Sequence, residues 1–262
     1  MNRSFCAVAA LLTAFAVCSP SAWAQKVPAK PAVKLPSAAS ILDASTKASG
    51  GTAALSKMKT IVMIGTLAIP AQKITGQVET RISFPDKIYS SQEISGFGKF
   101  EKGYDGKTGW SRDPLKGLQA VTGAELTQLK SQGDDMQNPN WRKAYSKAEM
   151  VGLRKVGAAN TYAIRLTPKR GGKPIVTYYD TKTKLPIRTD IVIETAEGST
   201  PTQSFTSDFR TVSGIVFPFK MRQVVGGVSE VNVVFTTIQV NAAIPGSVFA
   251  KPAETAPKPA KP

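Results

Sequence analysis

The chemistry open to this chain is limited first by the residue types that it lacks. The sequence contains no histidine, and its two cysteines, Cys6 and Cys18, both lie near the N-terminus. Histidine is the commonest general base, and histidine and cysteine supply most zinc ligands and most catalytic triads. The sequence therefore predicts a protein that is not an enzyme and that uses no metal and no cofactor.

Two short patterns resemble reactive sites. Asp134 and Asp135 form an acidic couplet, but an exposed couplet after a helix is typical of a solvated turn. Residues 106–108 read GKT, like the end of a phosphate-binding loop, yet that loop requires a glycine five residues before Gly106, where Glu101 stands. A hydrolase that uses carboxylates or a Ser-Lys pair remains a third interpretation, to which no motif points.

The N-terminus has the pattern of a secretory leader. Arg3 is the only charge before Lys26, and an apolar run follows it over residues 5–17. After Pro20, residues 22–24 read AWA, the small-x-small pattern that a signal peptidase cuts. We expect a signal peptide over residues 1–24, cleaved between Ala24 and Gln25, and hence export to the periplasm.

A membrane anchor and a lipid anchor are the alternatives to cleavage. The apolar run is shorter than the ~20 residues that span a bilayer. Lipid attachment at Cys18 is disfavoured, because Phe15 and Val17 depart from the residues that precede a lipidated cysteine. Cleavage removes both cysteines, so the processed chain has no disulfide and depends on a hydrophobic core for its stability.

The charge is strongly positive. The chain has 34 Lys+Arg against 18 Asp+Glu, a formal net charge of +16. Such a balance favours anionic partners, such as the lipid headgroups of an anionic membrane surface, lipopolysaccharide, cell-wall polymers or nucleic acid. Nucleic acid is disfavoured, because the chain is expected to be exported and has no recognisable binding motif. Residues 25–36 (QKVPAKPAVKLP) and 251–262 (KPAETAPKPAKP) read as extended Lys/Pro/Ala tails, which leaves one folded domain over 37–250.

The folded part opens with helical patterns and continues with strands. Residues 37–49 place apolar residues on one face, and Thr52 is expected to cap a second short helix. From residue 60 the period is two: Ile74, Val78 and Ile82 alternate with polar residues, and turn signals recur along the chain. One interruption, 122–145, begins with a capping box and predicts a helix that ends at Gly133.

A long consecutive meander of strands cannot stay flat. The sequence predicts a mainly β (α+β) protein, in which one strongly curved antiparallel sheet of about 11 strands forms an incomplete barrel lidded by short helices. Two or three short helices are too few to fill the concave face. We therefore expect an apolar cavity there, the usual setting for a hydrophobic ligand.

The order of several segments resembles the LolA-like family of outer-membrane lipoprotein-sorting proteins. These segments are ILDAS, AALSKMKTIVMIGTLAIP, FPDKI, GYDGKTGW, TYAIRLTP, VTYYDTKTKLPIR and SDFRTVSGIVFPFKM, and they cover about 41–249. No single segment is diagnostic of a family, so the resemblance lies in their order and spacing. It implies a half-barrel around an apolar cavity. Some members of the family carry lipoprotein acyl chains, and others bind other lipids or serve as sensor domains.

The leading hypothesis is a monomeric periplasmic protein that binds lipids or lipoprotein acyl chains, as a carrier in outer-membrane lipoprotein sorting or as a simple lipid binder. The alternative is a non-catalytic sensor or interaction module whose cavity is filled by its own side chains. The expected lining residues come from the helices, the insertion and the inner phase of the strands: Leu42, Leu55, Met58, Ile74, Val78, Ile82, Leu126, Leu129, Trp141, Ile164, Ile191, Phe217 and Phe219.

Overall fold

A computed structural model describes residues 34–137, 140–169, 171–195 and 198–253. The expected leader (1–24), most of the first tail and most of the second tail lie outside these ranges, as do the side chains of Asp134 and Asp135. Among the described residues, no helix is long and apolar enough to cross a membrane.

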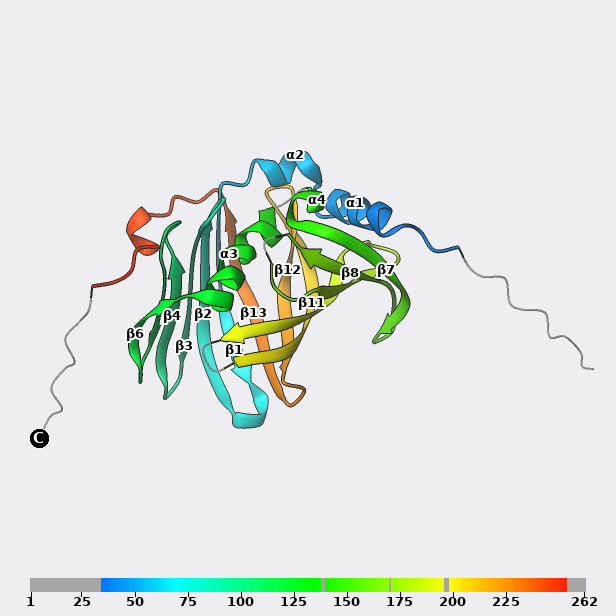
Figure 1. The fold of residues 1–262 in the computed structure, drawn as a ribbon. Helices are drawn as coiled ribbons and strands as arrows, with labels where there is room; N and C mark the ends of the chain where they lie inside the picture. Colours follow the sequence, from blue (N-terminus) through cyan, green and yellow to red (C-terminus); the bar gives the residue numbers. More distant parts are fainter. Residues whose placement is uncertain (1–33, 138–139, 170, 196–197, 254–262) are drawn as a thin grey trace, which may run out of the picture. The chain divides into compact units, whose positions relative to one another are not determined.

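The described chain is mainly β, and all thirteen of its strands belong to one antiparallel sheet (Figure 1). The order across the sheet is β6-β5-β4-β3-β2-β1-β13-β12-β11-β10-β9-β8-β7. The sheet is not closed into a barrel, since β6 and β7 are its two edges. The strands are β1 (Thr60–Ile69), β2 (Ile74–Ser83), β3 (Lys87–Ile94), β4 (Gly98–Tyr104), β5 (Gly109–Asp113), β6 (Gly117–Val121), β7 (Tyr145–Val156), β8 (Ala159–Pro168), β9 (Ile175–Asp180), β10 (Pro186–Thr195), β11 (Gly198–Val212), β12 (Ile215–Val225) and β13 (Ser229–Val240).

Few helices accompany the sheet, and most are short. They are α1 (Ala38–Ala48), α2 (Gly51–Ser56), α3 (Gly123–Gln137) and α4 (Trp141–Ala144), with 3₁₀ turns η1 (Pro70–Gln72) and η2 (Gly246–Val248). The first helix forms where the sequence predicts it, because the Ser37 hydroxyl accepts a hydrogen bond from the Ser40 N–H and so caps the helix. Its buried face carries Ile41 and Leu42.

Three details differ from the sequence predictions. The sheet has thirteen strands rather than about eleven, partly because β5 and β6 have only five residues each and show little alternation. The second helix is capped by Gly50, with a φ of 120°, and Thr52 lies inside it. The third helix runs through Gly133 to Gln137, since a glycine lowers helix stability by only about 1 kcal/mol and does not by itself end a helix.

The main hydrophobic core lies on one face of the sheet, which we call the inner face. It joins strands from both halves of the sheet with residues from α2 and α3. Met58 and Ile61 are fully buried in it. The alternation predicted for β2 is confirmed, because Ile82 is buried and Val78 packs against this core.

The third helix bridges distant parts of the sheet. Glu125 forms an ion pair with Lys102 on β4, while the Gln128 side-chain amide donates to the Val192 carbonyl of β10 (3.3 Å) and accepts from the Glu194 N–H (2.9 Å). Glu125 and Gln128 are less than one helical turn apart, whereas β4 and β10 are seven places apart in the sheet. In a flat sheet these strands would be roughly 33 Å apart. The sheet must therefore bend around α3.

The opposite, outer face of the sheet is not polar throughout, because a separate hydrophobic cluster lies on it. Beyond β13 the chain crosses the outer side of β3–β5, and Phe249 packs there against Tyr89 and Trp110. The Trp110 indole N–H donates to the Phe249 carbonyl oxygen at 2.9 Å. We call residues 242–250 the C-terminal strap. It gives this part of the sheet a second, smaller core.

Candidate functional site

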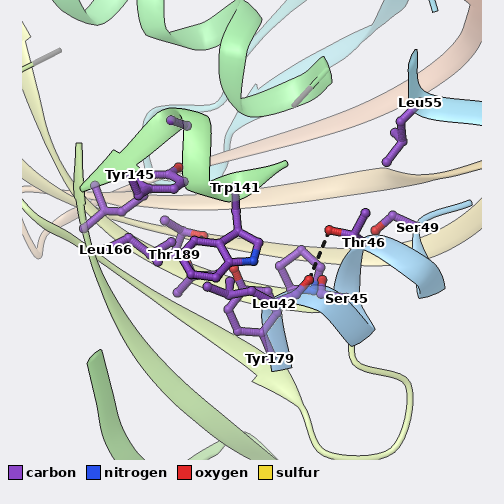
Figure 2. Close-up of a pocket in the computed structure, with 14 residues that line it drawn as sticks. Leu42, Ser45, Thr46, Ser49, Leu55, Trp141, Tyr145, Leu166, Tyr179 and Thr189 are labelled. Atoms are coloured by element: carbon purple, nitrogen blue, oxygen red, sulfur yellow. Dashed lines mark hydrogen bonds between the residues drawn. The ribbon is translucent and has the colours of Figure 1, made fainter. Parts of the chain in front are cut away.

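A cleft of about 280 Å³ lies where α1 and α4 meet the inner face of β8–β10 (Figure 2). Its position follows from a second hydrophobic cluster, in which Ile41 and Leu42 of α1 pack against Ile164 and Leu166 of β8. The lining residues come from α1, α2, α4 and four strands: Leu42, Ser45, Thr46, Ser49, Leu55, Trp141, Ala144, Tyr145, Leu166, Ile175, Thr177, Tyr179, Pro186 and Thr189.

The cleft combines apolar walls with hydroxyl groups. Ser45 and Thr177 are buried, and the Thr177 and Thr189 hydroxyls lie 3.4 Å apart on neighbouring strands. The Thr46 hydroxyl instead donates to the Leu42 carbonyl of its own helix, the bond dashed in Figure 2. Such a lining suits a ligand that has a hydrocarbon part and a neutral polar group, for example an ester.

One charged side chain joins the two helices that border the cleft. Asp43 of α1 accepts hydrogen bonds from Arg142 (2.8 and 3.1 Å) and from the Trp141 indole N–H (2.8 Å) of α4. The Arg142 guanidinium also stacks over the Trp141 ring, 4.3 Å from its centre. The hydrogen bonds from Arg142, followed by the one from Trp141, lower the pKa of Asp43 below its ordinary value of 3.8. This Asp43 contact holds Trp141 in place.

Replacing Asp43 with alanine should make Trp141 more accessible to solvent without unfolding the protein, because the contact is exposed and surface ion pairs contribute little stability. Collisional quenching of indole emission by acrylamide measures this in the chain without the expected leader, which contains Trp23, since Trp110 is buried and protected. Asp86→Ala, at an exposed turn, is the control and should change nothing. Since the pKa of Asp43 is lower in the folded state than its ordinary value of 3.8, the contact persists above that pH and is lost only as the pH falls through the lowered pKa. Unchanged quenching in Asp43→Ala would contradict the assignment.

The structure separates the thirteen predicted lining residues into four groups. Leu42, Leu55 and Trp141 line the cleft, and Ile164 is buried in the cluster behind it. Ile74 and Ile191 are half-buried strand residues outside these clusters. The remaining seven belong to the main core or pack against it: Met58, Val78, Ile82, Leu126, Leu129, Phe217 and Phe219.

Most of the cleft was missed because the prediction selected apolar residues only. Ser45 lies on the same face of α1 as Leu42, and Thr189 lies on the inner phase of its strand, so both positions were readable from periodicity. Tyr179 and Ala144 gave no such signal. Their place depends on how β9 and α4 meet α1, which is a long-range contact.

A second hollow, of about 680 Å³, lies at the far end of β1, β2 and β3. Leu67 and Ile94 contribute apolar surface to it, and Thr66, Gln77 and Glu93 contribute polar groups. It is broader and more open than the cleft. Within the described residues, no three acidic side chains gather closely enough to hold a metal ion.

The comparisons with known proteins rest on structure alone. The sequence matches no family model and no curated protein. Three solved structures share the fold along nearly their whole length. A DUF1329 family protein from Desulfovibrio piger aligns with a TM-score of 0.56 and 14% identity, over 84% of this chain and 100% of that one. A LolA superfamily protein from Nitrosomonas europaea aligns with a TM-score of 0.53 and 14% identity, over 83% of this chain and 99% of that one.

The third is described as an outer-membrane lipoprotein-sorting protein domain, from Vibrio parahaemolyticus. It aligns with a TM-score of 0.51 and 10% identity, over 82% of this chain and 97% of that one. The fold is LolA-like. At these identities the likeness establishes the architecture, and the role of the cleft has to be argued from its own residues.

Proposed function

We propose that this protein is an exported periplasmic protein that binds one acyl chain of a lipid or lipoprotein in the cleft between α1 and β8–β10. The observation that carries the proposal is the composition of the cleft, whose walls of Leu42, Trp141 and Leu166 adjoin the buried hydroxyls of Ser45 and Thr177. Each methylene that enters such a site contributes about 0.8 kcal/mol. At about 280 Å³, the cleft is at the lower limit of usual ligand pockets, so it suits one chain rather than several.

The rest of the proposal follows from the leader and the fold. Cleavage of residues 1–24 would deliver the chain to the periplasm, where residues 37–250 form the LolA-like domain between two Lys/Pro/Ala tails. We take the bent sheet as the half-barrel expected from the sequence, with α1 and α4 as its lid. Non-catalytic binding, in outer-membrane lipoprotein sorting or in handling another lipid, is the role that this arrangement suits.

A second candidate is an interaction module that carries no lipid. It is favoured by the filling of the inner face, where α3 lies against the sheet and Met58 and Ile61 are fully buried. The two candidates differ in what the cleft does, because the interaction module needs no ligand there.

Titration with a brominated C16 fatty acid tests the leading proposal. Bromine quenches a nearby indole, so we expect saturable quenching of Trp141, which lines the cleft. The Trp141→Phe variant should lose the effect, because Trp110 is buried on the outer face. Lipid extracted from the purified protein and identified by mass spectrometry would name the natural ligand.

A matched pair of variants links the binding to the cleft. Ala144 lines the cleft. The larger side chain of Ala144→Phe should displace roughly two methylenes of the ligand at about 0.8 kcal/mol each, and so weaken the affinity measured by quenching at least about tenfold. Ala120→Phe, at an exposed position on β6, should bind like the unaltered protein. Absence of both quenching and co-purified lipid would reject the proposal in favour of the interaction module.

A further inference from the structure

The most exposed apolar side chains of the described residues lie on the tips of three hairpins. Phe97 in the β3–β4 turn is 58% exposed, Leu115 in the β5–β6 turn 92%, and Val228 in the β12–β13 turn 90%. The other large exposed apolar residues lie within strands and are only 37–45% exposed. Singly scattered exposed apolar residues are ordinary. Three such residues on the tips of hairpins are not ordinary.

The topology puts these three tips at one end of the sheet. In an antiparallel meander, successive turns alternate between the two ends, so the β1–β2, β3–β4, β5–β6 and β12–β13 turns share one end. The β1–β2 and β12–β13 hairpins point away from α2 in Figure 1. These four hairpins are consecutive neighbours across eight strands. Their tips therefore form a row with a spacing of roughly 10 Å.

The opposite end of the sheet is built differently. Its turns at 84–86, 105–108, 157–158, 181–184 and 213–214 expose no large apolar side chain. Two of them are organised by aspartate, as the β5–β6 turn also is: Asp105 accepts from the N–H groups of Lys107 and Thr108, and Asp180 does the same for its own turn. The apolar tips are thus a property of one end and not of this protein's hairpins in general.

The charged residues in the turns of these four hairpins are lysines. The turns 70–73, 95–97, 114–116 and 226–228 contain no acidic residue and carry Lys73 and Lys116, both exposed. Asp113 precedes its turn, and its carboxylate accepts from the Leu115 and Lys116 N–H groups, which holds Leu115 at the tip. A row of turns that carries both apolar side chains and lysines favours an anionic bilayer, where the hydrocarbon enters the interface and the ammonium groups meet phosphates.

We propose that this end of the sheet, the row of turns that carries Phe97, Leu115 and Val228, docks on the surface of a bilayer containing anionic lipids. A bilayer fits better than a protein partner, because the three side chains stand on separate tips rather than in one contiguous patch. A fluid interface accepts such separate insertions. The docking surface lies away from the cleft and does not depend on what the cleft binds.

Vesicle co-flotation tests the proposal. We expect the protein to bind vesicles of phosphatidylglycerol and phosphatidylethanolamine, and pure phosphatidylcholine vesicles much more weakly. The triple variant Phe97→Thr, Leu115→Thr, Val228→Thr should bind at least about tenfold more weakly. The matched control Val151→Thr, Leu153→Thr, Val234→Thr changes exposed strand positions and should bind normally. Equal binding by the tip variant, or equal loss in the control, would overturn the proposal.

A tryptophan scan gives an independent readout of which end touches lipid. In Phe97→Trp, anionic vesicles should shift the indole emission to the blue, and brominated lipid should quench it. In Ala158→Trp, at an exposed turn of the opposite end, neither change should occur. The reverse pattern would show that the other end docks. The pair Lys73→Gln, Lys116→Gln should lower the affinity for anionic vesicles by about thirtyfold, at about 1 kcal/mol for each lysine, and leave the weak binding to phosphatidylcholine vesicles unchanged. Unchanged binding to anionic vesicles would overturn the choice of an anionic surface.

Discussion

Replacing Phe249 with alanine should lower the free energy of unfolding by about 3–5 kcal/mol, the usual cost of removing a buried aromatic side chain. Phe249 is only 1% exposed and closes the outer-face cluster formed with Tyr89 and Trp110. Its backbone accepts the Trp110 indole hydrogen bond, so the side chain and the main chain fix the same contact. This residue ties the chain after the last strand to hairpins more than a hundred residues earlier.

Urea unfolding followed by circular dichroism measures the loss. Phe97→Ala is the matched control, because Phe97 is the same residue type at 58% exposure and should change stability little. In a Trp141→Phe background, Phe249→Ala should also shift Trp110 emission to the red as water reaches the ring. A loss below 1 kcal/mol would mean that the C-terminal strap rests on the sheet without stabilising it.

The packing of the C-terminal strap could not be predicted from the sequence. Ile244, Val248 and Phe249 follow the last strand without helical or strand periodicity and adjoin a Lys/Pro/Ala tail. Local patterns therefore gave no sign that they pack. Trp110 and Tyr89 were similarly ambiguous, because a strand buried on both faces loses its alternation. Only the long-range contact decides that β3–β5 are covered on the outer side as well.

Elements with strong local signals were predictable. The apolar stripe with Ile41 and Leu42 placed α1, and the period of two in β2 assigned Ile82 to the inner face. The candidate site was harder. The position of the site depends on how far the sheet bends and on which side chains fill its inner face. One contact that sets the bend, between Gln128 and the edge of β10 beyond the end of β9, is a tertiary contact without a sequence motif. The predicted cavity residues were hence spread between core and cleft.

At Gly65, by contrast, the structure requires that a side chain be absent. It lies in β1 at the register shift against β13, in the middle of the sheet. A Cβ atom at this position would collide with the Val234 carbonyl oxygen and come within 2.8 Å of the Phe235 Cα. Both are backbone atoms of a paired strand, so no rotamer change relieves the clash. The glycine lets β1 and β13 approach closely at the irregularity.

Gly65→Ala should therefore destabilise the protein by about 3 kcal/mol, the upper end of the usual cost of overpacking. Gly246→Ala is the control, because a Cβ there meets nothing within 4 Å and the glycine has no positive φ. Urea unfolding measures both, and amide hydrogen exchange should show the loss first in β1 and β13. Near-native stability of Gly65→Ala would mean that the two strands can separate at the bulge. The pairing of β1 with β13 at the centre of the sheet would then be easier to deform than its close backbone contacts imply. The bend of the sheet around α3 would depend on that deformation.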